Sequence, residues 1–347
     1  MPRFFLLCLT PIVVSFCALF STDRNISLEL IATIPNPCPQ YSLIHSVDCH
    51  PIKKLFCVTY PSDNRVMIYE YEDAYRPTVF QSLQNPSACL NAPSHALFSS
   101  DGKKMIVINW MDRIITIHCE QGNGLYSEVT NAVISPPSSL ADLHPHGMAL
   151  SPCGNFLAIA YGWSNSSTRA IALFYLNDLL GCELRDCLYT QDLDGTPKGV
   201  TFTPDEKCLA VTFSDLNALM IYSIDDETHT IHREPKQVVA GPATGMLRPE
   251  GVKISPDGRH CAVTNSELCT ITFYPFDPMQ NRVTQDVPEY TLQSGLSFPH
   301  GIDFSPNGSY FIVTDFGPIG TTANGSLDMK HLPQPSQSKI NIYLLRH

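Results

Sequence analysis

The chain has 347 residues, of which 44% are hydrophobic and only 16% are charged, and its formal net charge is −11. This composition excludes an intrinsically disordered chain and a coiled coil, because both are rich in charged residues. The acidic balance also argues against nucleic acid as a partner, since that binding depends on clustered Lys and Arg. The 28 prolines and 19 glycines indicate many short elements joined by turns.

The N-terminal segment differs in composition from the rest of the chain. Phe4 to Phe20 is almost wholly apolar and follows Arg3. Such a run of about 17 residues is at the lower limit for a spanning helix, and it also reads as a signal peptide. We therefore expect residues 1–21 to be a signal or anchor segment of an exported or membrane-anchored protein, with a cytoplasmic location as the alternative. Contact with a membrane would involve only residues 1–20, if they are not cleaved.

The chain contains 13 cysteines, 11 of them beyond the N-terminal segment. An odd number at irregular spacing does not form a disulfide framework, and the absence of a CxxC pair makes a structural zinc site of the usual spacing unlikely. Cys182 and Cys187 could pair in an oxidising compartment, so the redox state stays open. Three other cysteines lie in apolar, strand-like runs and are expected to be buried: Cys57, Cys208 and Cys261.

A repeat of about 50 residues organises the chain. Four copies are clear: HPHGMALSPCGNFLAIAY from His144, TPKGVTFTPDEKCLAVTF from Thr196, RPEGVKISPDGRHCAVTN from Arg248 and FPHGIDFSPNGSYFIVTD from Phe298. Two weaker copies begin at Ile44 and Pro93. When the copies are aligned on the proline of the Ser-Pro turn, successive anchors are 49, 52, 52, 52 and 50 residues apart; these anchors are Pro51, Ser100, Pro152, Pro204, Pro256 and Pro306.

Each repeat reads as four short strands bounded by turn residues. In the fourth copy these strands are Val200–Thr203, Cys208–Phe213, Ala218–Tyr222 and the more polar Pro235–Ala240. Four strands at a period near 50 are typical of a β-propeller blade. The two middle strands are apolar at successive positions, which fits sheets covered on both faces by neighbouring blades.

The last repeat ends too close to the C-terminus to supply a fourth strand. Ser27–Ile34 (SLELIATI) is an unassigned strand at the other end of the chain, and we expect it to complete the last blade. Strands from both termini would then close the ring and leave no open edge. The predicted fold is all-β, a single propeller of six four-stranded blades over residues 27–347, with seven blades as the alternative.

The repeated unit P-x-G-h-x-h-S-P-D/N-G, followed by an apolar strand and a strand ending in Tyr, resembles the lactonase-type propellers. These are the 6-phosphogluconolactonase and muconate-cycloisomerase-like family, with the YVTN-repeat proteins as relatives. The resemblance is clearest from His144 to Leu184. It implies a propeller, usually of seven blades, and a lactonase-like activity on a small oxygenated substrate.

Polar residues recur where the first strand of each blade should line the central channel. The residue six positions before each anchor is polar in every copy: His45, Ser94, His146, Lys198, Glu250 and His300. Sixfold symmetry would set His146 across from His300, His45 across from Lys198, and Ser94 across from Glu250. The second strands return to the same face and end in a second set of residues: Tyr60, Asn109, Tyr161, Phe213, Asn265 and Asp315.

These two sets suggest catalytic and substrate-binding roles. His300 or His146 would be the general base, with Asp315 orienting His300. Lys198 would stabilise an oxyanion, and the charged neighbours of Glu250 could shift its pKa. The candidate substrate-binding residues are His45, Ser94, Tyr60, Asn109, Tyr161 and Asn265. The alternative is that these positions are polar only because propeller channels are wet.

Long connections are expected at the same face. The loop Phe316–Ser338 is long for a segment without regular structure and could act as a lid. Gly162–Arg169 and Pro136–Leu143 are shorter connections that should also lie there. We therefore expect this face to be the binding face of the propeller.

No cofactor is firmly implied, because the chain lacks a P-loop, G-x-G-x-x-G, G-x-S-x-G and H-E-x-x-H. His146, His300 and Glu250 could hold a divalent metal, although we expect residues on opposite sides of a channel to lie too far apart for bonds of about 2 Å to one ion. One hypothesis is a monomeric lactonase-like hydrolase or isomerase for a small molecule. The other is a non-enzymatic scaffold whose same face binds a protein or peptide.

Overall fold

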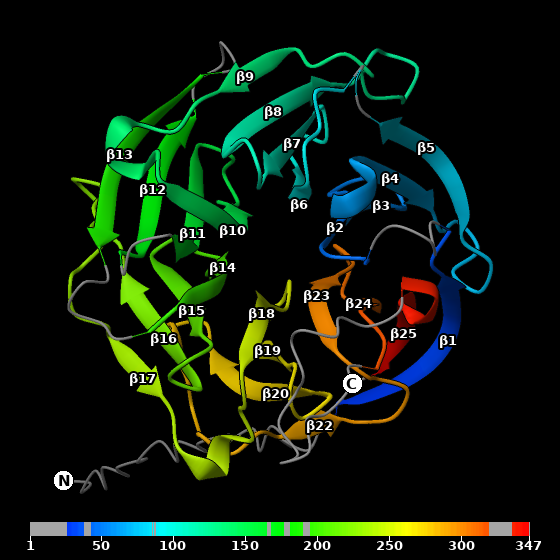
Figure 1. Ribbon diagram of the computed structural model, residues 1–347. Helices are drawn as coiled ribbons and strands as arrows, with labels where there is room; N and C mark the ends of the chain where they lie inside the picture. The colour runs from blue at the N-terminus through cyan, green and yellow to red at the C-terminus, as the bar shows by residue number, and fades with distance from the viewer. Residues whose placement is uncertain are drawn as a thin grey trace, which may run out of the picture.

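The structure is a computed structural model that describes residues 26–37, 43–84, 86, 88–164, 168–176, 181–189, 195–318 and 335–346. These residues form six antiparallel sheets set around a central channel as the blades of a propeller (Figure 1). Within the described ranges, regular structure other than strand is limited to short 3-10 turns. The predicted fold class is confirmed, with six blades rather than seven.

In each blade the strands run outward from the channel in sequence order, with the exception of the last blade. Blade 1 contains β2 (Val47–Cys49), β3 (Leu55–Tyr60), β4 (Arg65–Glu70) and β5 (Thr78–Gln84). Blade 2 contains β6 (Pro93–Phe98), β7 (Lys104–Asn109), β8 (Ile114–Cys119) and β9 (Ala132–Ile134). Blade 3 contains β10 (Leu143–Leu150), β11 (Phe156–Ser164), β12 (Ala170–Leu176) and β13 (Cys182–Tyr189).

The remaining blades follow the same plan. Blade 4 contains β14 (Pro197–Phe202), β15 (Cys208–Phe213), β16 (Ala218–Ser223) and β17 (Gln237–Val239). Blade 5 contains β18 (Pro249–Ile254), β19 (His260–Asn265), β20 (Thr270–Asp277) and β22 (Tyr290–Leu292), and the two-residue β21 (Arg282–Val283) also pairs with β20. Blade 6 contains β23 (Pro299–Phe304), β24 (Tyr310–Asp315), β25 (Lys339–Arg346) and β1 (Ser27–Pro35).

Blade 6 closes the ring with strands from both ends of the chain. β1 pairs antiparallel with β25, from Ser27 opposite Arg346 to Pro35 opposite Lys339, with one irregularity near Ile31. In Figure 1 the blue strand β1 lies along the outer side of the red strand β25. The predicted closure is therefore confirmed, and β25 does not end the ring as an unpaired edge.

The hydrophobic core lies between the blades. Every residue of β3 and of β15 is buried, as expected for middle strands packed on both faces. One apolar cluster joins blades 3 and 4, and others join the remaining neighbours around the ring. Three cysteines fill this core as small apolar residues, as predicted: Cys57, Cys208 and Cys261.

Cys182 and Cys187 do not form the disulfide that an oxidising compartment could have allowed. Both are free thiols, and both lie on β13, opposite Leu176 and Ala172 of β12. Five residues of strand separate two Cα atoms by roughly 16 Å, whereas a disulfide needs less than about 7 Å. Their side chains pack instead against the apolar cluster between blades 2 and 3.

Several predicted segments fall outside the described residues. They include the N-terminal segment 1–21 and most of the expected lid, residues 319–334. Of Gly162–Arg169, residues 165–167 are also outside them, whereas Pro136–Leu143 is described and contains the 3-10 turn Ser138–Leu140. The described part of the chain holds no helix of the length and apolarity that crossing a membrane requires.

Candidate functional site

Glycine brings the main chains of neighbouring blades together at the channel. In four blades, the residue after the predicted channel residue is Gly147, Gly199, Gly251 or Gly301. A Cβ added to Gly251 would lie 2.6 Å from the carbonyl oxygen of His300, and one added to Gly301 would lie 2.8 Å from that of His45. These glycines therefore allow the first strand of the next blade to approach closely.

Threonine hydroxyls hold the same contacts from the second strand. Thr314 Oγ1 donates to the carbonyl of His45 over 2.7 Å and accepts the N–H of Gly301 over 2.8 Å. Thr264 Oγ1 likewise donates to the carbonyl of His300 and accepts the N–H of Gly251. Thr59 and Thr212 make the matching pairs of bonds. The main chain of several channel residues is thus fixed by the preceding blade.

Five of the six predicted channel residues line one narrow cavity of about 40 Å³: His45, His146, Lys198, Glu250 and His300. The sixth, Ser94, is buried away from it, and the next residue, His95, lines the cavity instead. The pairing of β6 with β7 is irregular between Pro93 and His95. Blade 3 has the same irregularity between Pro145 and Gly147, and His146 still lines the cavity there, so the strand pairing does not explain the exchange. Blade 2 differs in having the short side chain of Ser94, followed by His95 in place of the glycine of four other blades.

The Glu250 carboxylate is the centre of this cluster. Its side chain is only 5% exposed, and its Oε2 has no hydrogen-bond partner. Lys198 Nζ lies 3.7 Å from Oε2, and the Nε2 atoms of His146 and His300 lie 3.8 and 3.9 Å from it. On the other carboxylate oxygen, Arg248 Nε lies at 3.7 Å. One carboxylate therefore faces two cations and two imidazoles.

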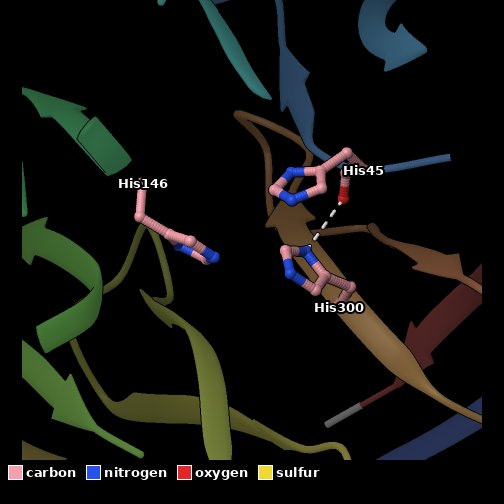
Figure 2. Close-up of side chains that lie close together, drawn as sticks. All are labelled: His45, His146 and His300. Atoms are coloured by element: carbon pink, nitrogen blue, oxygen red, sulfur yellow. Dashed lines mark hydrogen bonds between the residues drawn. The ribbon is translucent and has the colours of Figure 1, made fainter. Parts of the chain in front are cut away.

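The three histidines lie closer together than their places on different blades suggest. The ring of His45 is 4.0 Å from that of His300, and the ring of His146 is 5.5 Å from both, measured between centroids. Figure 2 shows the rings around a shared space, with His300 bonded through Nδ1 to the main-chain oxygen of His45. The channel is therefore narrow enough for side chains from opposed blades to meet.

Burial keeps these imidazoles uncharged. It lowers the pKa of His45 and His146 well below the ordinary value, and the positive charge of Lys198 lowers both further. Burial, followed by the charge of Lys198, lowers the pKa of His300 to about 3. A group with such a pKa binds a proton weakly at neutral pH. His300 is consequently a poor general base in this environment, which argues against the predicted role.

Asp315 does not orient His300. Its carboxylate accepts the backbone N–H groups of Ser297, Phe298 and Gly317. Asp315 lies opposite Pro299 in the ladder between β24 and β23, and neighbouring side chains of a strand point to opposite faces. His300 therefore faces the channel while Asp315 caps the loop ends beside it.

The rest of the second set is buried in the blades and is not among the residues lining the cavity. The hydroxyl of Tyr60 bonds to that of Tyr69, and the amide of Asn109 bonds to Thr116 and to the N–H of Asn91. Asn265 bonds to two threonine hydroxyls of β20, and Tyr161 packs in the cluster between blades 2 and 3. Their described contacts are structural.

Sequence reasoning missed five residues at or beside the channel. His95 stands where four blades have glycine, which was a visible departure from the repeat. Lys253 Nζ lies 3.3 Å from Asp48 Oδ1 and 3.2 Å from Asp303 Oδ1. Each of these three residues stands three positions before the anchor of its repeat. A charged residue inside the apolar first strand was a signal that could have identified them. The fifth is Phe316, whose ring stacks on that of His300 with 4.5 Å between the centroids.

Comparison with known proteins agrees with this architecture. Three solved structures are similar over most of their length: a hydrazine synthase of Kuenenia stuttgartiensis (16% identity, TM-score 0.55, 81% of this chain and 75% of that one), a Lactobacillus plantarum protein (12%, 0.59, 86% and 87%) and a Bacteroides uniformis protein provisionally named a 6-phosphogluconolactonase (12%, 0.54, 85% and 87%). At these identities the likeness shows the fold alone.

No protein with a curated description matches the chain. A family model described as "Lactonase, 7-bladed beta-propeller" matches residues 27–248, which is more than half of the sequence. The six-bladed ring differs from the blade number in that description. On the strength of this match, the chain belongs to the lactonase family of β-propellers.

Proposed function

We propose that the protein hydrolyses the cyclic ester of a small oxygenated substrate at the mouth of the channel. The observation that carries this proposal is the buried Glu250 carboxylate, whose Oε2 lies 3.7 Å from the Lys198 ammonium and faces two neutral imidazoles. A carboxylate that can accept a proton beside a fixed cation is what ester hydrolysis requires. Membership of the lactonase family supports the same reaction type.

Glu250 and Lys198 have different roles in this reaction. Glu250 accepts a proton from water as the water oxygen attacks the acyl carbon of the lactone. Lys198 stabilises the negative charge that develops on the carbonyl oxygen. The tetrahedral intermediate collapses with cleavage of the ring C–O bond, and the leaving alkoxide takes up the proton from Glu250. The product is the open-chain hydroxy acid.

The small size of the cavity supports a position for the substrate at the channel mouth. About 40 Å³ holds a few water molecules but not a sugar ring. The attacking water therefore occupies the channel, and the substrate ring lies at its mouth with only the acyl group reaching Glu250. Phe316 is itself buried and stacks on His300, so it supports that ring from behind.

A panel of sugar lactones, with and without a phosphate group, tests the proposal. The Bacteroides uniformis neighbour provides the reason for including phosphorylated lactones. We expect hydrolysis of at least one lactone, and we expect Glu250→Gln to lower kcat by about 10²–10⁴ and Lys198→Met by about 10²–10³. The exposed histidine variant His232→Ala is the control and should keep the activity.

Each outcome separates the two functions that the sequence suggested. Loss of hydrolysis in Glu250→Gln, with an unchanged melting temperature, supports the catalytic role. If the native protein hydrolyses no lactone, or if Glu250→Gln is as active as His232→Ala, the proposal is refuted. The scaffold that binds a protein or peptide would then be the better explanation.

A further inference from the structure

We propose that His45, His146 and His300 bind one divalent transition-metal ion on the channel axis, with a water molecule as its fourth ligand. One potential ligand atom from each of these histidines lies within 4.8 Å of those of the other two. This set differs from the one predicted from the sequence, which contained His146, His300 and Glu250 and was expected to lie too far apart across the channel. The structure brings three imidazoles together and places the carboxylate beside them.

The spacing of the imidazoles suits such an ion after a small movement. Zn–N bonds of about 2.0–2.1 Å in a tetrahedral site put two nitrogens roughly 3.4 Å apart. From separations of at most 4.8 Å, each ring has to move inward by less than about 1 Å. Figure 2 shows that the rings enter the shared space from different sides, so they do not block one another.

Main-chain carbonyls fix two of the rings in the form that a metal needs. His45 Nδ1 lies 2.7 Å from the carbonyl oxygen of Ser94, and His300 Nδ1 lies 3.2 Å from that of His45. A carbonyl only accepts, so each Nδ1 carries the hydrogen and each Nε2 keeps its lone pair. In metal-binding histidines, the ring nitrogen that does not bind the metal commonly donates its hydrogen to a carbonyl or carboxylate in this way. Burial also keeps the rings neutral.

Glu250 supplies the negative charge near the ion. Its Oε2 is buried without a hydrogen-bond partner, 3.8 Å from His146 Nε2 and 3.9 Å from His300 Nε2. A buried charged oxygen with an unused lone pair is costly, and a metal-bound water would donate to it. Three imidazoles with one open position are a ligand set typical of Zn²⁺. This role of the water rests on the proposed hydrolysis, whereas binding of the ion does not.

Lys198 gives the proposal an unusual test. Its ammonium lies 3.7 Å from Glu250 Oε2 and so adds a positive charge beside the place of the ion. Two cations repel one another most strongly where water is excluded. Lys198→Met should therefore tighten metal binding while it lowers hydrolysis. A variant that merely loosened the fold would weaken both, so the two explanations are separable.

In the experiment, the full chain is first treated with a chelator and then titrated with Co²⁺, whose binding is monitored by its visible absorption. Zn²⁺ is then added to displace the bound Co²⁺. We expect one equivalent to bind in a site of low coordination number. His146→Ala removes a metal ligand. It should therefore weaken binding by more than the tenfold to hundredfold seen when only a hydrogen-bond partner of a ligand is removed. Glu250→Gln removes no ligand but does remove the negative charge beside the ion, so it should weaken binding by about tenfold to hundredfold, less than His146→Ala does. The matched control is His232→Ala, which removes an exposed histidine of blade 4 that is not part of the site.

Binding is measured without a lactone, so failure of the metal site and failure of the hydrolase proposal are distinguishable. If His146→Ala folds poorly, Lys198→Met still decides, because tighter binding cannot arise from a damaged fold. The proposal is overturned if Co²⁺ does not bind stoichiometrically. It is equally overturned if His232→Ala weakens binding as much as His146→Ala does, or if Lys198→Met fails to increase the affinity.

Discussion

His95 shows how a single side chain can make the whole protein sensitive to acid. Burial, followed by the positive charge of Lys253, lowers its pKa to about 3. The unfolded chain takes up this proton below about pH 6.5, whereas the folded chain does not. Because the unfolded state binds more protons in this window, the free energy of unfolding falls as the pH falls. The slope is up to about 1.4 kcal/mol per pH unit for one such group.

Replacing His95 with the residue found in four other blades tests this. Between pH 6.5 and 4, the free energy of unfolding should fall less steeply with falling pH in His95→Gly, and the difference in slope should correspond to about one bound proton. This holds whatever the effect of the substitution on stability at neutral pH. Urea unfolding at several pH values gives the slope for each variant. The exposed His232→Ala should leave the slope unchanged. A native-like slope in His95→Gly would mean that His95 accepts a proton in the folded state.

The position of most channel residues could be predicted because the repeat fixes their distance from the Ser-Pro turn. The rule failed at Ser94, which does not line the cavity, whereas His95, in the position that is glycine in four other blades, does. It failed again for the pair of His300 and Asp315, since the backbone amides of three residues satisfy that carboxylate. Local pairing and protonation depend on three-dimensional packing, which sequence spacing does not contain.

At the level of strands, a threonine of the second strand links the first strand to the next blade in four of the six blades. Thr314 joins blade 6 to blade 1, through its bonds to the N–H of Gly301 and the carbonyl of His45. Four of the six second strands have a threonine at this position, but two do not: blade 2 has Ile108 and blade 3 has Ala160. These threonine hydrogen bonds, called the threonine latch below, therefore strengthen the contacts between some neighbouring blades but not others.

Thr314→Val tests the latch because it keeps the shape of the side chain and removes its hydroxyl. The N–H of Gly301 loses its described acceptor inside the protein, and this should cost about 1–3 kcal/mol of unfolding free energy. Thr314→Ser retains the hydroxyl and should lose less. Denaturant unfolding measures both. Equal losses in the two variants would show that packing of the methyl group, and not the hydrogen bonds, matters here.

The closing strand could be predicted because the last repeat lacked a fourth strand and Ser27–Ile34 lacked a partner. The structure places β1 against β25 over nearly the whole of its length. The ends of the outer strands were harder to place. Pro235–Ala240 is shortened to β17, Gln237–Val239, because few neighbours fix an outer strand and turns compete with it.

For the whole molecule, the blade number followed from counting strands and available chain length. A seventh blade would need about 45–50 further residues, and the ring closes with six. The family description, which names seven blades, would have misled on this point. What could not be predicted is how narrow the channel is, because this depends on glycines and hydrogen bonds that draw the first strands together.

A buried charge cluster ties together the three blades at which the ring closes. Lys253 of blade 5 lies 3.3 Å from Asp48 of blade 1 and 3.2 Å from Asp303 of blade 6. The other oxygens of the two carboxylates accept the N–H groups of Phe98 and Cys49. Burial raises the pKa of Asp48 to about 7, although Lys253 opposes that rise. The cation therefore favours the ionised form of the buried Asp48 carboxylate.

Removing the cation alone should be more harmful than removing the whole cluster. Lys253→Met leaves buried carboxylates without their partner and should cost about 3–5 kcal/mol of unfolding free energy. The triple variant with Asp48→Asn and Asp303→Asn should recover most of that loss, because no buried charge remains. Urea unfolding at pH 8 and pH 5 measures both variants.

The pH dependence supplies the check on this explanation. Without Lys253, the pKa of Asp48 should rise further, so the folded state binds a proton that the unfolded state releases above about pH 4. The free energy of unfolding then falls as pH rises, and Lys253→Met should be more destabilised at pH 8 than at pH 5. The triple variant has no carboxylate to titrate and should show no such difference. If both variants lose the same stability at both pH values, the cluster acts by packing and its charges do not hold the closing blades together.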